Sequence, residues 1–180
     1  MDKKIRAGIL TISDKGARGR REDESGKTVL RILVGHGFDV ANRDIVPDER
    51  QKIADILVRW TDVDRLPLIV TSGGTGLSPT DVTPQAMEQV IDYQVPGMAE
   101  AMRAESLKKT PHAMISRAMV GVRKASLIIN LPGSPRGAEE NLSVVLPALE
   151  HALSKLAGDP TDCADTPSPS LPDAQDKETP

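Results

Sequence analysis

The chain has 180 residues, which is enough to bury one sizeable hydrophobic core, and 38% of them are apolar. Aromatic residues make up only 2% and the net charge is −3, which argues against single-stranded nucleic-acid binding, because those surfaces interleave aromatic platforms with basic residues. The single cysteine, Cys163, excludes an internal disulfide, and no apolar run approaches the roughly 20 residues of a membrane span or forms a signal peptide. We therefore expect a cytoplasmic protein that binds neither nucleic acid nor membranes.

The composition changes sharply after residue 157. Residues 158–180 are rich in proline and acidic residues, and Leu171 is their only large apolar residue. This segment carries six acids and one lysine, a net charge of −5, which leaves +2 for residues 1–157. A segment that cannot bury apolar surface stays unfolded. The sequence therefore predicts one domain over residues 1–157 and a disordered acidic Pro/Ser-rich tail over residues 158–180, which is more simply a solvated extension than a partner-binding segment.

The first half of the chain alternates strand-like and helix-like segments. A strand is expected over residues 5–12, followed by a polar insert over residues 15–26 and a helix over residues 27–36. A second, weaker strand is expected over residues 39–46. The next helix begins at residues 47–49, and its apolar residues recur at i, i+3, i+4 and i+7 as one buried stripe: Ile53, Ile56, Leu57 and Trp60.

The second half of the chain continues this alternation. The short apolar run over residues 68–71 is typical of a central parallel strand. Thr83 and Pro84 predict a helix start, as the N-cap and the first helical residue. The remaining expected elements are a helix over residues 97–109, a strand over residues 127–131 and a helix over residues 136–156. Strands that alternate with helices predict an α/β fold, a three-layer α/β/α arrangement with a mostly parallel central sheet.

Ligands of open parallel sheets bind at the carboxyl ends of the strands, because loops and helix N-termini converge there. All four predicted strands end in polar or glycine-rich residues: Ser13-Asp14, Pro47-Asp48, Ser72-Gly73-Gly74-Thr75-Gly76 and Pro132-Gly133-Ser134. The third group is the most informative, since its glycines allow a close approach and can present consecutive N–H groups to an anion. It lacks the lysine of a Walker A motif. Taken alone, a tight strand-to-helix turn explains these glycines about as well.

Two aspartates lie near this group. Asp81 precedes the Thr83-Pro84 helix start, where its carboxylate would lie beside exposed helix N–H groups, either as a functional acid or as an alternative cap. Asp48 precedes Glu49 at the start of an amphipathic helix, and capping is the stronger reading of that local pattern. At neighbouring strand ends, however, two carboxylates could instead hold Mg²⁺ against a nucleotide phosphate.

Further candidates lie in the second half of the chain. Gly133 and Ser134 open the last helix and could offer N–H and hydroxyl groups to a phosphate or a base, with an ordinary helix start as an equally good alternative. Arg117, Arg123 and Lys124 are candidate cationic partners for a substrate phosphate. Solvated surface charge is the simpler reading for any one of them.

Four pieces of the sequence together resemble one family: TSGGTGLSPTDVTP (residues 71–84), VPDER (46–50), ESLKKTPHAMISRAMVGVR (105–123) and SLIINLPGSPRGAEENL (126–142). They resemble the MogA-type molybdopterin adenylyltransferases, whose eukaryotic relatives include the G domain of gephyrin. The resemblance covers residues 3–157 in order and leaves the tail outside. It implies a molybdopterin-binding-domain fold, a homotrimer, and Mg²⁺-dependent adenylyl transfer from ATP to the terminal phosphate of molybdopterin, a step of molybdenum cofactor biosynthesis.

The resemblance also implies roles for individual residues. The residues that would bind the nucleotide phosphates are Ser72, Gly73, Gly74, Thr75 and Gly76, and those that would contact the rest of the nucleotide are Pro132, Gly133 and Ser134. Asp48 and Asp81 would be the catalytic acidic pair and the Mg²⁺ ligands. The residues that would border the pterin are Ser116, Arg117 and the Ser13-Asp14 corner. The basic run Arg18, Arg20 and Arg21 departs from the family pattern in the first loop.

Two other functions fit the same resemblance. MoaB-type paralogues share the fold, and some of them lack adenylyl transfer; a non-catalytic trimeric molybdopterin-binding or scaffolding module is the other alternative. A scaffold would need neither Asp48 nor Asp81, so these residues favour the enzyme. An active enzyme would hand its product to a molybdate-inserting enzyme.

Overall fold

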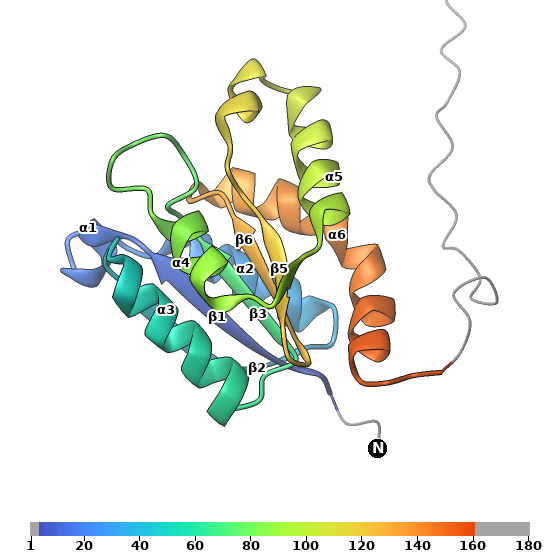
Figure 1. Ribbon diagram of the computed structural model, residues 1–180. Helices are drawn as coiled ribbons and strands as arrows, with labels where there is room; N and C mark the ends of the chain where they lie inside the picture. Colours follow the sequence, from blue (N-terminus) through green and yellow to red (C-terminus); the bar gives the residue numbers. More distant parts are fainter. Residues whose placement is uncertain (1–3, 161–180) are drawn as a thin grey trace, which may run out of the picture.

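The computed structural model describes residues 4–160, and its centre is one six-stranded sheet in the order β2-β1-β3-β6-β5-β4 (Figure 1). The strands are β1 (Arg6–Ile12), β2 (Asp39–Val46), β3 (Leu68–Ser72), β4 (Tyr93–Gln94), β5 (Val120–Arg123) and β6 (Ser126–Leu131). Strands β2, β1, β3 and β6 are parallel to one another, whereas β5 is antiparallel to β6 and β4 is antiparallel to β5. The expected α/β fold with a mostly parallel sheet is therefore confirmed.

Helices cover both faces of this sheet (Figure 1). They are α1 (Asp14–Ala17), α2 (Glu24–Gly35), α3 (Arg50–Val58), the π-helical turn η1 (Arg59–Val63), α4 (Thr83–Val90), α5 (Pro96–Leu107), the 3₁₀ turn η2 (Pro111–Ile115) and α6 (Pro135–Leu156). Helices α2, α5 and α6 supply the core on one face, and α3 and α4 supply it on the other. Within residues 4–160, none of the helices combines the length and the apolar character that crossing a bilayer requires.

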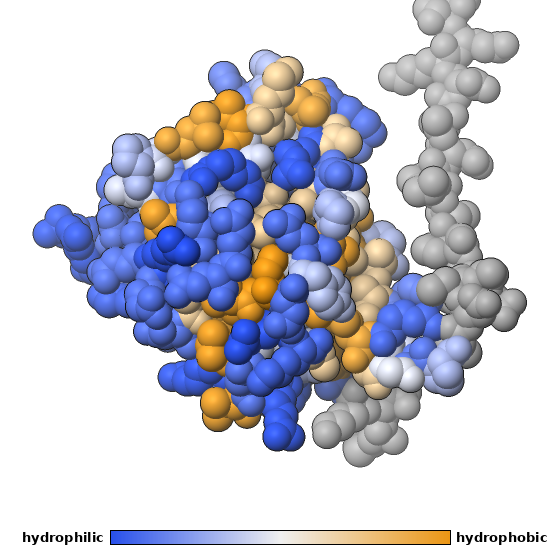
Figure 2. Space-filling model, viewed as in Figure 1, coloured by the Kyte–Doolittle hydropathy of each residue, from blue (hydrophilic) through white to orange (hydrophobic). Residues whose placement is uncertain are grey.

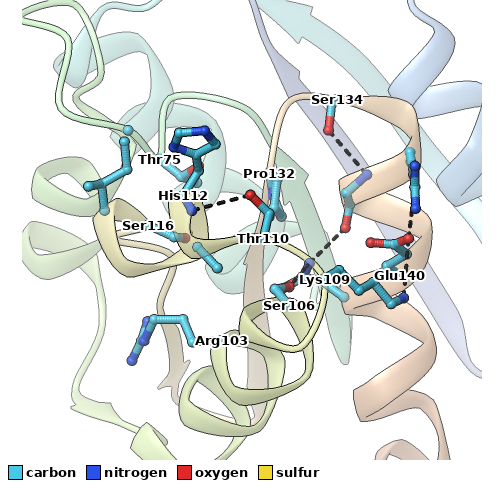
Figure 3. A pocket seen from close by; sticks show the side chains of 16 residues that line it. Thr75, Arg103, Ser106, Lys109, Thr110, His112, Ser116, Pro132, Ser134 and Glu140 are labelled. Carbon is cyan, nitrogen blue, oxygen red and sulfur yellow. Dashed lines mark hydrogen bonds and ion pairs between the residues drawn. The ribbon is translucent and has the colours of Figure 1, made fainter.

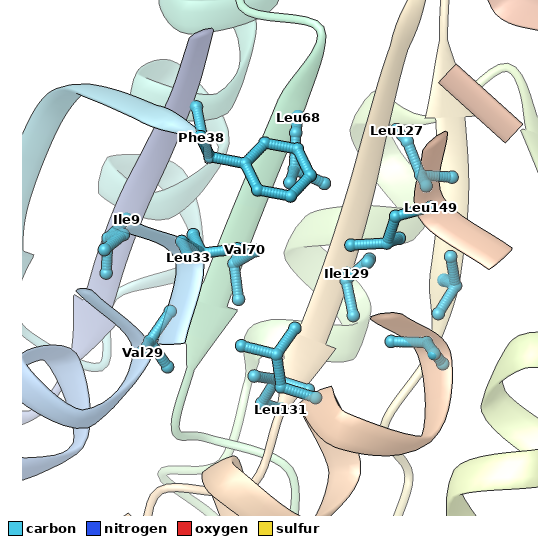
Figure 4. Close-up of a cluster of buried hydrophobic side chains, with 14 of the residues drawn as sticks. Ile9, Val29, Leu33, Phe38, Leu68, Val70, Leu127, Ile129, Leu131 and Leu149 are labelled. Carbon is cyan, nitrogen blue, oxygen red and sulfur yellow. The ribbon is translucent and has the colours of Figure 1, made fainter. Parts of the chain in front are cut away.

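The two cores meet the central strands on opposite faces, because successive side chains of a strand point in opposite directions. Ile9 and Leu10 are neighbours in β1 and are both fully buried, one in each core. Figure 4 shows the first core, where Ile9 and Val70 of the sheet face Leu33 of α2. A strand buried on both faces needs apolar residues at consecutive positions, which explains the apolar residues 68–70 of β3 and 127–129 of β6. Each fully buried side chain of this size contributes about 1.5–3 kcal/mol.

The structure corrects several sequence-based boundaries. Helix α2 begins at Glu24 rather than at residue 27, because Asp23 caps it by accepting a 2.8 Å hydrogen bond from the Gly26 N–H. Thr83 is the first residue of α4 and not its N-cap; that place belongs to Val82, and the buried Thr83 hydroxyl has no partner among the described residues. Strands β4 and β5 were not expected. Of the predicted tail, residues 161–180 lie outside the described residues.

Candidate active site

Two neighbouring cavities open at the carboxyl ends of β1, β3 and β6. The first, of about 340 Å³, is called the aspartate cavity and is lined by Ser13, Asp48, Gly73, Gly74, Asp81 and Gly133, among others. The second, of about 430 Å³, is called the helical cavity and lies between α5, η2 and the start of α6, with Thr75, Gly76, Ser116 and Pro132 in its wall (Figure 3). Ser134 lines both cavities. The glycine-rich loop after β3 therefore contributes Gly73 and Gly74 to the aspartate cavity and Thr75 and Gly76 to the helical cavity.

The glycine-rich loop has a backbone shape that requires glycine at its start. Gly73 and Gly74 have φ values of +112° and +63°, and a Cβ at Gly73 would overlap the carbonyl oxygen of Ile12. The N–H of Gly73 already donates a 3.0 Å hydrogen bond to the Leu131 carbonyl. By contrast, in the part of the chain that the structure describes, the N–H groups of Gly74, Thr75 and Gly76 have no hydrogen-bond partner. These three consecutive amides are the groups that an anion could bind.

The start of this loop is fastened to the end of β6. The Ser72 hydroxyl donates a 3.0 Å hydrogen bond to the Pro132 carbonyl, and the amide of the fully buried Asn130 donates to the Gly73 carbonyl at 3.3 Å. A Cβ at Gly133 would lie 3.2 Å from the Cα of Gly73, so the two loop backbones pack directly on each other. Ser72 is buried in this junction and positions the loop, rather than facing either cavity.

Asp48 does not cap α3. The N-cap of that helix is Glu49, without a side-chain hydrogen bond, whereas Asp48 Oδ2 accepts a 2.9 Å hydrogen bond from the Asp14 N–H. The Asp48 N–H returns a 3.3 Å hydrogen bond to Asp14 Oδ1. Partial burial raises the pKa of the Asp48 carboxyl above its ordinary value, and the negative charges of Asp14 and Asp81 act in the same direction. A partly buried carboxylate with negative neighbours is a favourable place for a cation.

Asp81 faces the same loop from its other end. Its Oδ2 accepts a 2.9 Å hydrogen bond from the Ser78 N–H, and a Cβ at Gly76 would lie 2.8 Å from that oxygen. The side chain therefore closes the loop instead of capping α4. The Oδ1 atoms of Asp48 and Asp81 have no hydrogen-bond partner among the described residues.

The carboxylates of Asp48 and Asp81 could hold Mg²⁺ if a substrate phosphate supplies further oxygen ligands. Residues 4–160 contain no group of three or more His, Cys, Asp or Glu side chains arranged to hold a metal ion, so the protein alone forms no complete metal cage. Magnesium in nucleotide enzymes is typically bound by one or two carboxylates, with substrate phosphates and waters completing the shell. Asp48 and Asp81 fit that arrangement when a phosphate lies on the adjoining amides.

The predicted pterin-side residues are not brought together. Ser13 caps α1, accepting a 3.1 Å hydrogen bond from the Gly16 N–H, and it lines the aspartate cavity next to Asp48. Ser116 lines the helical cavity. Arg117 lines neither cavity, since its guanidinium is bound to backbone carbonyls of the glycine-rich loop. Ser13 and Ser116 therefore line different cavities, and Asp14 lines neither of them.

Ser134 caps α6 and also borders both cavities. Its hydroxyl accepts a 3.1 Å hydrogen bond from the Gly137 N–H and thereby caps α6. The same residue lies on the border between the two cavities, at the N-terminal end of a helix of 22 residues. The positive end of the helix dipole at this point favours a negatively charged ligand.

Two of the predicted cationic partners are committed elsewhere. Arg123 makes hydrogen bonds of 2.9 and 2.7 Å to the two carboxylate oxygens of Asp62, and Lys124 forms a 3.0 Å ion pair with the same residue. The pKa of Asp62 is held well below its usual range by these bonds, chiefly those from Arg123. Asp62 lies in η1, so this cluster joins η1 to the β5–β6 hairpin and contributes no cation to either cavity.

The helical cavity has three cations that were not predicted from the sequence: Arg103, Lys109 and Arg136. Figure 3 labels the first two. Lys109 and Arg136 both pair with Glu140, at 3.2 and 2.9 Å. A signal was present in the helical spacing, because Arg103 and Ser106 are three residues apart on α5 and therefore share a face. In the aspartate cavity the missed residues include Asp23 and Ser25 of the α2 start.

Exposed apolar side chains lie on the end of α5 and on η2, and one of them, Ile115, lines the helical cavity. Figure 2 shows apolar surface at the top of the molecule, where the end of α5 and the turn η2 lie. Leu107, Met114 and Ile115 belong to these elements and expose 42%, 72% and 51% of their surface. The helical cavity therefore has cations in its wall and exposed apolar surface on the elements beside it.

Comparisons with known proteins agree with this geometry. The family described as "Probable molybdopterin binding domain" matches residues 8–151. The molybdopterin adenylyltransferase of Helicobacter pylori is 40% identical over 156 residues, which cover 86% of this chain and 89% of that protein. Gephyrin of Dictyostelium discoideum is 39% identical over 163 residues, which cover 85% of this chain but only 23% of gephyrin. The molybdopterin biosynthesis enzyme MoaB of Thermus thermophilus superposes with a TM-score of 0.82 at 51% identity, over 88% of this chain and 99% of that one. This chain therefore belongs to the molybdopterin-binding-domain family of molybdenum cofactor biosynthesis proteins.

Proposed function

We propose that this protein transfers the adenylyl group of ATP to the terminal phosphate of molybdopterin and releases pyrophosphate. The observation that carries the proposal is the row of unpartnered amides at Gly74, Thr75 and Gly76, which passes from the aspartate cavity to the helical cavity. Amides without partners at the border of two cavities suit the α-phosphate of ATP, which is bound from one cavity and attacked from the other. The relative from Helicobacter pylori carries the name of this activity.

Each cavity suits one substrate. The aspartate cavity would hold the triphosphate of ATP, with its α-phosphate at the Gly74 end of the amide row. The helical cavity would hold molybdopterin, whose terminal phosphate would be attracted by cations such as Arg103 and Lys109. The two substrates would then meet at the loop from opposite sides, which is the in-line geometry that phosphoryl and nucleotidyl transfer require.

The chemistry asks little covalent work of the protein. An oxygen of the molybdopterin phosphate forms a bond to the α-phosphorus of ATP, while the bond from that phosphorus to the bridging oxygen of the β-phosphate breaks and its electron pair leaves with pyrophosphate. No general base is needed, because the attacking phosphate is already ionised. The amides of the loop would stabilise the charge that develops on the α-phosphate oxygens. Asp48 and Asp81 would hold Mg²⁺, which would neutralise the triphosphate.

The proposal extends to the setting of the enzyme. We expect a cytoplasmic homotrimer that requires Mg²⁺ and ATP and hands adenylylated molybdopterin to a molybdate-inserting enzyme. Light scattering on the purified protein tests the trimer.

The test of the activity is an assay with ATP, Mg²⁺ and molybdopterin that measures both pyrophosphate and adenylylated molybdopterin. We expect Asp81→Asn to lower the rate at least about a hundredfold, because a charge that acts in the transition state is lost. Asp55→Asn is the matched control, since Asp55 is exposed on α3 and its carboxylate, within residues 4–160, accepts a hydrogen bond from Gln51 alone. An Asp81→Asn variant with the wild-type rate would remove Asp81 from the mechanism.

A MoaB-type or scaffolding role is the second candidate, and the 51% identity to a MoaB protein favours keeping it. The same assay separates the two functions. Molybdopterin binding without any formation of pyrophosphate by the wild-type protein would support the second candidate and contradict the first.

A further inference from the structure

Arg117 holds residues 75–81 of the glycine-rich loop near both ends of that segment. Its backbone N–H donates a 2.8 Å hydrogen bond to the Thr75 carbonyl, its Nε donates a 2.8 Å hydrogen bond to the Gly76 carbonyl, and its Nη2 donates a 2.5 Å hydrogen bond to the Asp81 carbonyl. One half-buried residue, distant in sequence, therefore ties three carbonyls of the loop together.

The segment 76–81 depends on this residue. Its other hydrogen bonds run within the segment, such as those from the Ser78 N–H to the Asp81 carboxylate and from the Asp81 N–H to the Ser78 carbonyl. In residues 4–160, Arg117 makes the only hydrogen bonds between residues 76–81 and the rest of the chain. The exposed loop tip, with Leu77 64% exposed, has no core contact that would replace them.

Fixing these carbonyls also fixes the amides on the opposite side. A peptide unit is planar, and its C=O and N–H point in opposite directions. The bond to the Thr75 carbonyl therefore aims the N–H of Gly76 away from Arg117, and Gly76 is one of the unpartnered amides of the site. The bond to the Asp81 carbonyl fixes the backbone from which the Asp81 carboxylate extends.

We infer that Arg117 is a positioning residue for adenylyl transfer: its guanidinium sets the place of the Asp81 carboxylate and its backbone N–H sets the direction of the Gly76 amide, without touching either substrate. The catalytic part of this inference rests on the proposed function, whereas the part concerning the loop does not. Arg117 directly follows Ser116, which lines the helical cavity. The same short segment therefore contributes to the wall of that cavity and supports the glycine-rich loop that both cavities share. Lysine cannot take this role, because a single ammonium lacks the planar fork that reaches two carbonyls.

Hydrogen exchange of the ligand-free protein tests the loop. In Arg117→Lys, we expect the hydrogen-bonded amides of Ser78 and Asp81 to exchange at least about tenfold faster than in the wild type, because the loop opens locally when its anchors are lost. Arg123→Lys is the matched control, because Arg123 binds the Asp62 carboxylate and the Val90 carbonyl and not the loop. This variant should leave the exchange rates of the loop amides unchanged. Unchanged exchange in Arg117→Lys would overturn the inference whether or not the protein is an adenylyltransferase.

Kinetics test the link to catalysis. Arg117→Lys should lower kcat about ten- to a hundredfold with a smaller change in the KM for ATP, and in an Asp81→Asn background it should have almost no further effect, because both changes disable the same carboxylate. Arg117→Ala should regain part of its rate with added ethylguanidinium. Equal effects of Arg117→Lys in both backgrounds, or no rescue, would overturn the positioning role. A wild-type protein without transferase activity would instead refute the proposed function, and the exchange result would then stand by itself.

Discussion

The Gly76→Ala substitution separates the position of the Asp81 carboxylate from the stability of the fold. An added Cβ would lie 2.8 Å from Asp81 Oδ2, whereas ordinary contacts begin at about 3.4 Å. Gly76 does not have a positive φ, so its backbone accepts alanine without strain. The carboxylate must therefore retreat by about half an ångström, and it gives way because it is the free end of a side chain. Misplacement by about 1 Å costs up to a hundredfold in rate, so we expect kcat to fall about tenfold.

Steady-state kinetics and denaturant unfolding of the same preparations measure both quantities. We expect the free energy of unfolding of Gly76→Ala to stay within about 0.5 kcal/mol of the wild type. Gly97→Ala is the control: Gly97 is exposed in α5 with nothing within 4 Å of the added Cβ. It should keep its kcat and gain up to about 1 kcal/mol of stability, because alanine favours helices. A wild-type kcat in Gly76→Ala would refute the argument that the place of this carboxylate matters, and a parallel loss of stability would mean that the loop itself has collapsed.

Three further outcomes follow from the same geometry. Gly73→Ala should lower the free energy of unfolding by about 2–4 kcal/mol, since it combines a strained φ with overlap against the Ile12 backbone; thermal denaturation showing a loss below about 1 kcal/mol would contradict this. Asp48→Asn should abolish transfer yet unfold at neutral pH with a free energy equal to or above that of the wild type. The raised pKa of Asp48 means that its charged form destabilises the fold, so the stability gained by Asp48→Asn should shrink as the pH falls through that pKa. An Asp48→Asn variant that is less stable than the wild type at neutral pH would contradict this prediction. Asp62→Asn should be less stable than the wild type at neutral pH, because the lowered pKa of Asp62 means that its charged form stabilises the fold above the unfolded pKa of about 4. The difference in free energy of unfolding between the two proteins should diminish below that pH. A difference that does not change with pH would refute the role of the Asp62 charge.

Local sequence patterns were sufficient for the layout of the protein. Short apolar runs such as that over residues 68–71 indicated strands buried on both faces, and their alternation with amphipathic helices indicated a mostly parallel sheet. The strand-end rule then selected the segments after β1, β2, β3 and β6, and the structure brings these segments to one edge of the sheet. The strand β5 escaped prediction because four residues are too short to show a period, and its pairing with β6 is a tertiary contact.

Local patterns failed where a side chain has more than one possible partner. Asp48 has the sequence context of a helix cap, yet the N–H that it accepts from belongs to Asp14, 34 residues earlier in the chain. Thr83 has the context of a cap and caps nothing. Arg117 resembles a surface cation or a substrate contact, and only the fold shows that it binds carbonyls 36 and 41 residues away.

By itself, the sequence indicated the four parallel strands with the helices between them, located the glycine-rich loop and, through its resemblance to a family, supplied the candidate residues. The tertiary structure decided which of those residues share a cavity: Ser13 with Asp48, Ser116 with the far end of the loop, and Arg117 outside both. It also decided which amides are open to a ligand, since the Gly73 N–H is already bonded to Leu131. The physical reason is that periodicity and capping depend on neighbours a few residues apart, whereas hydrogen-bond partners at the site depend on how separate strands are brought side by side.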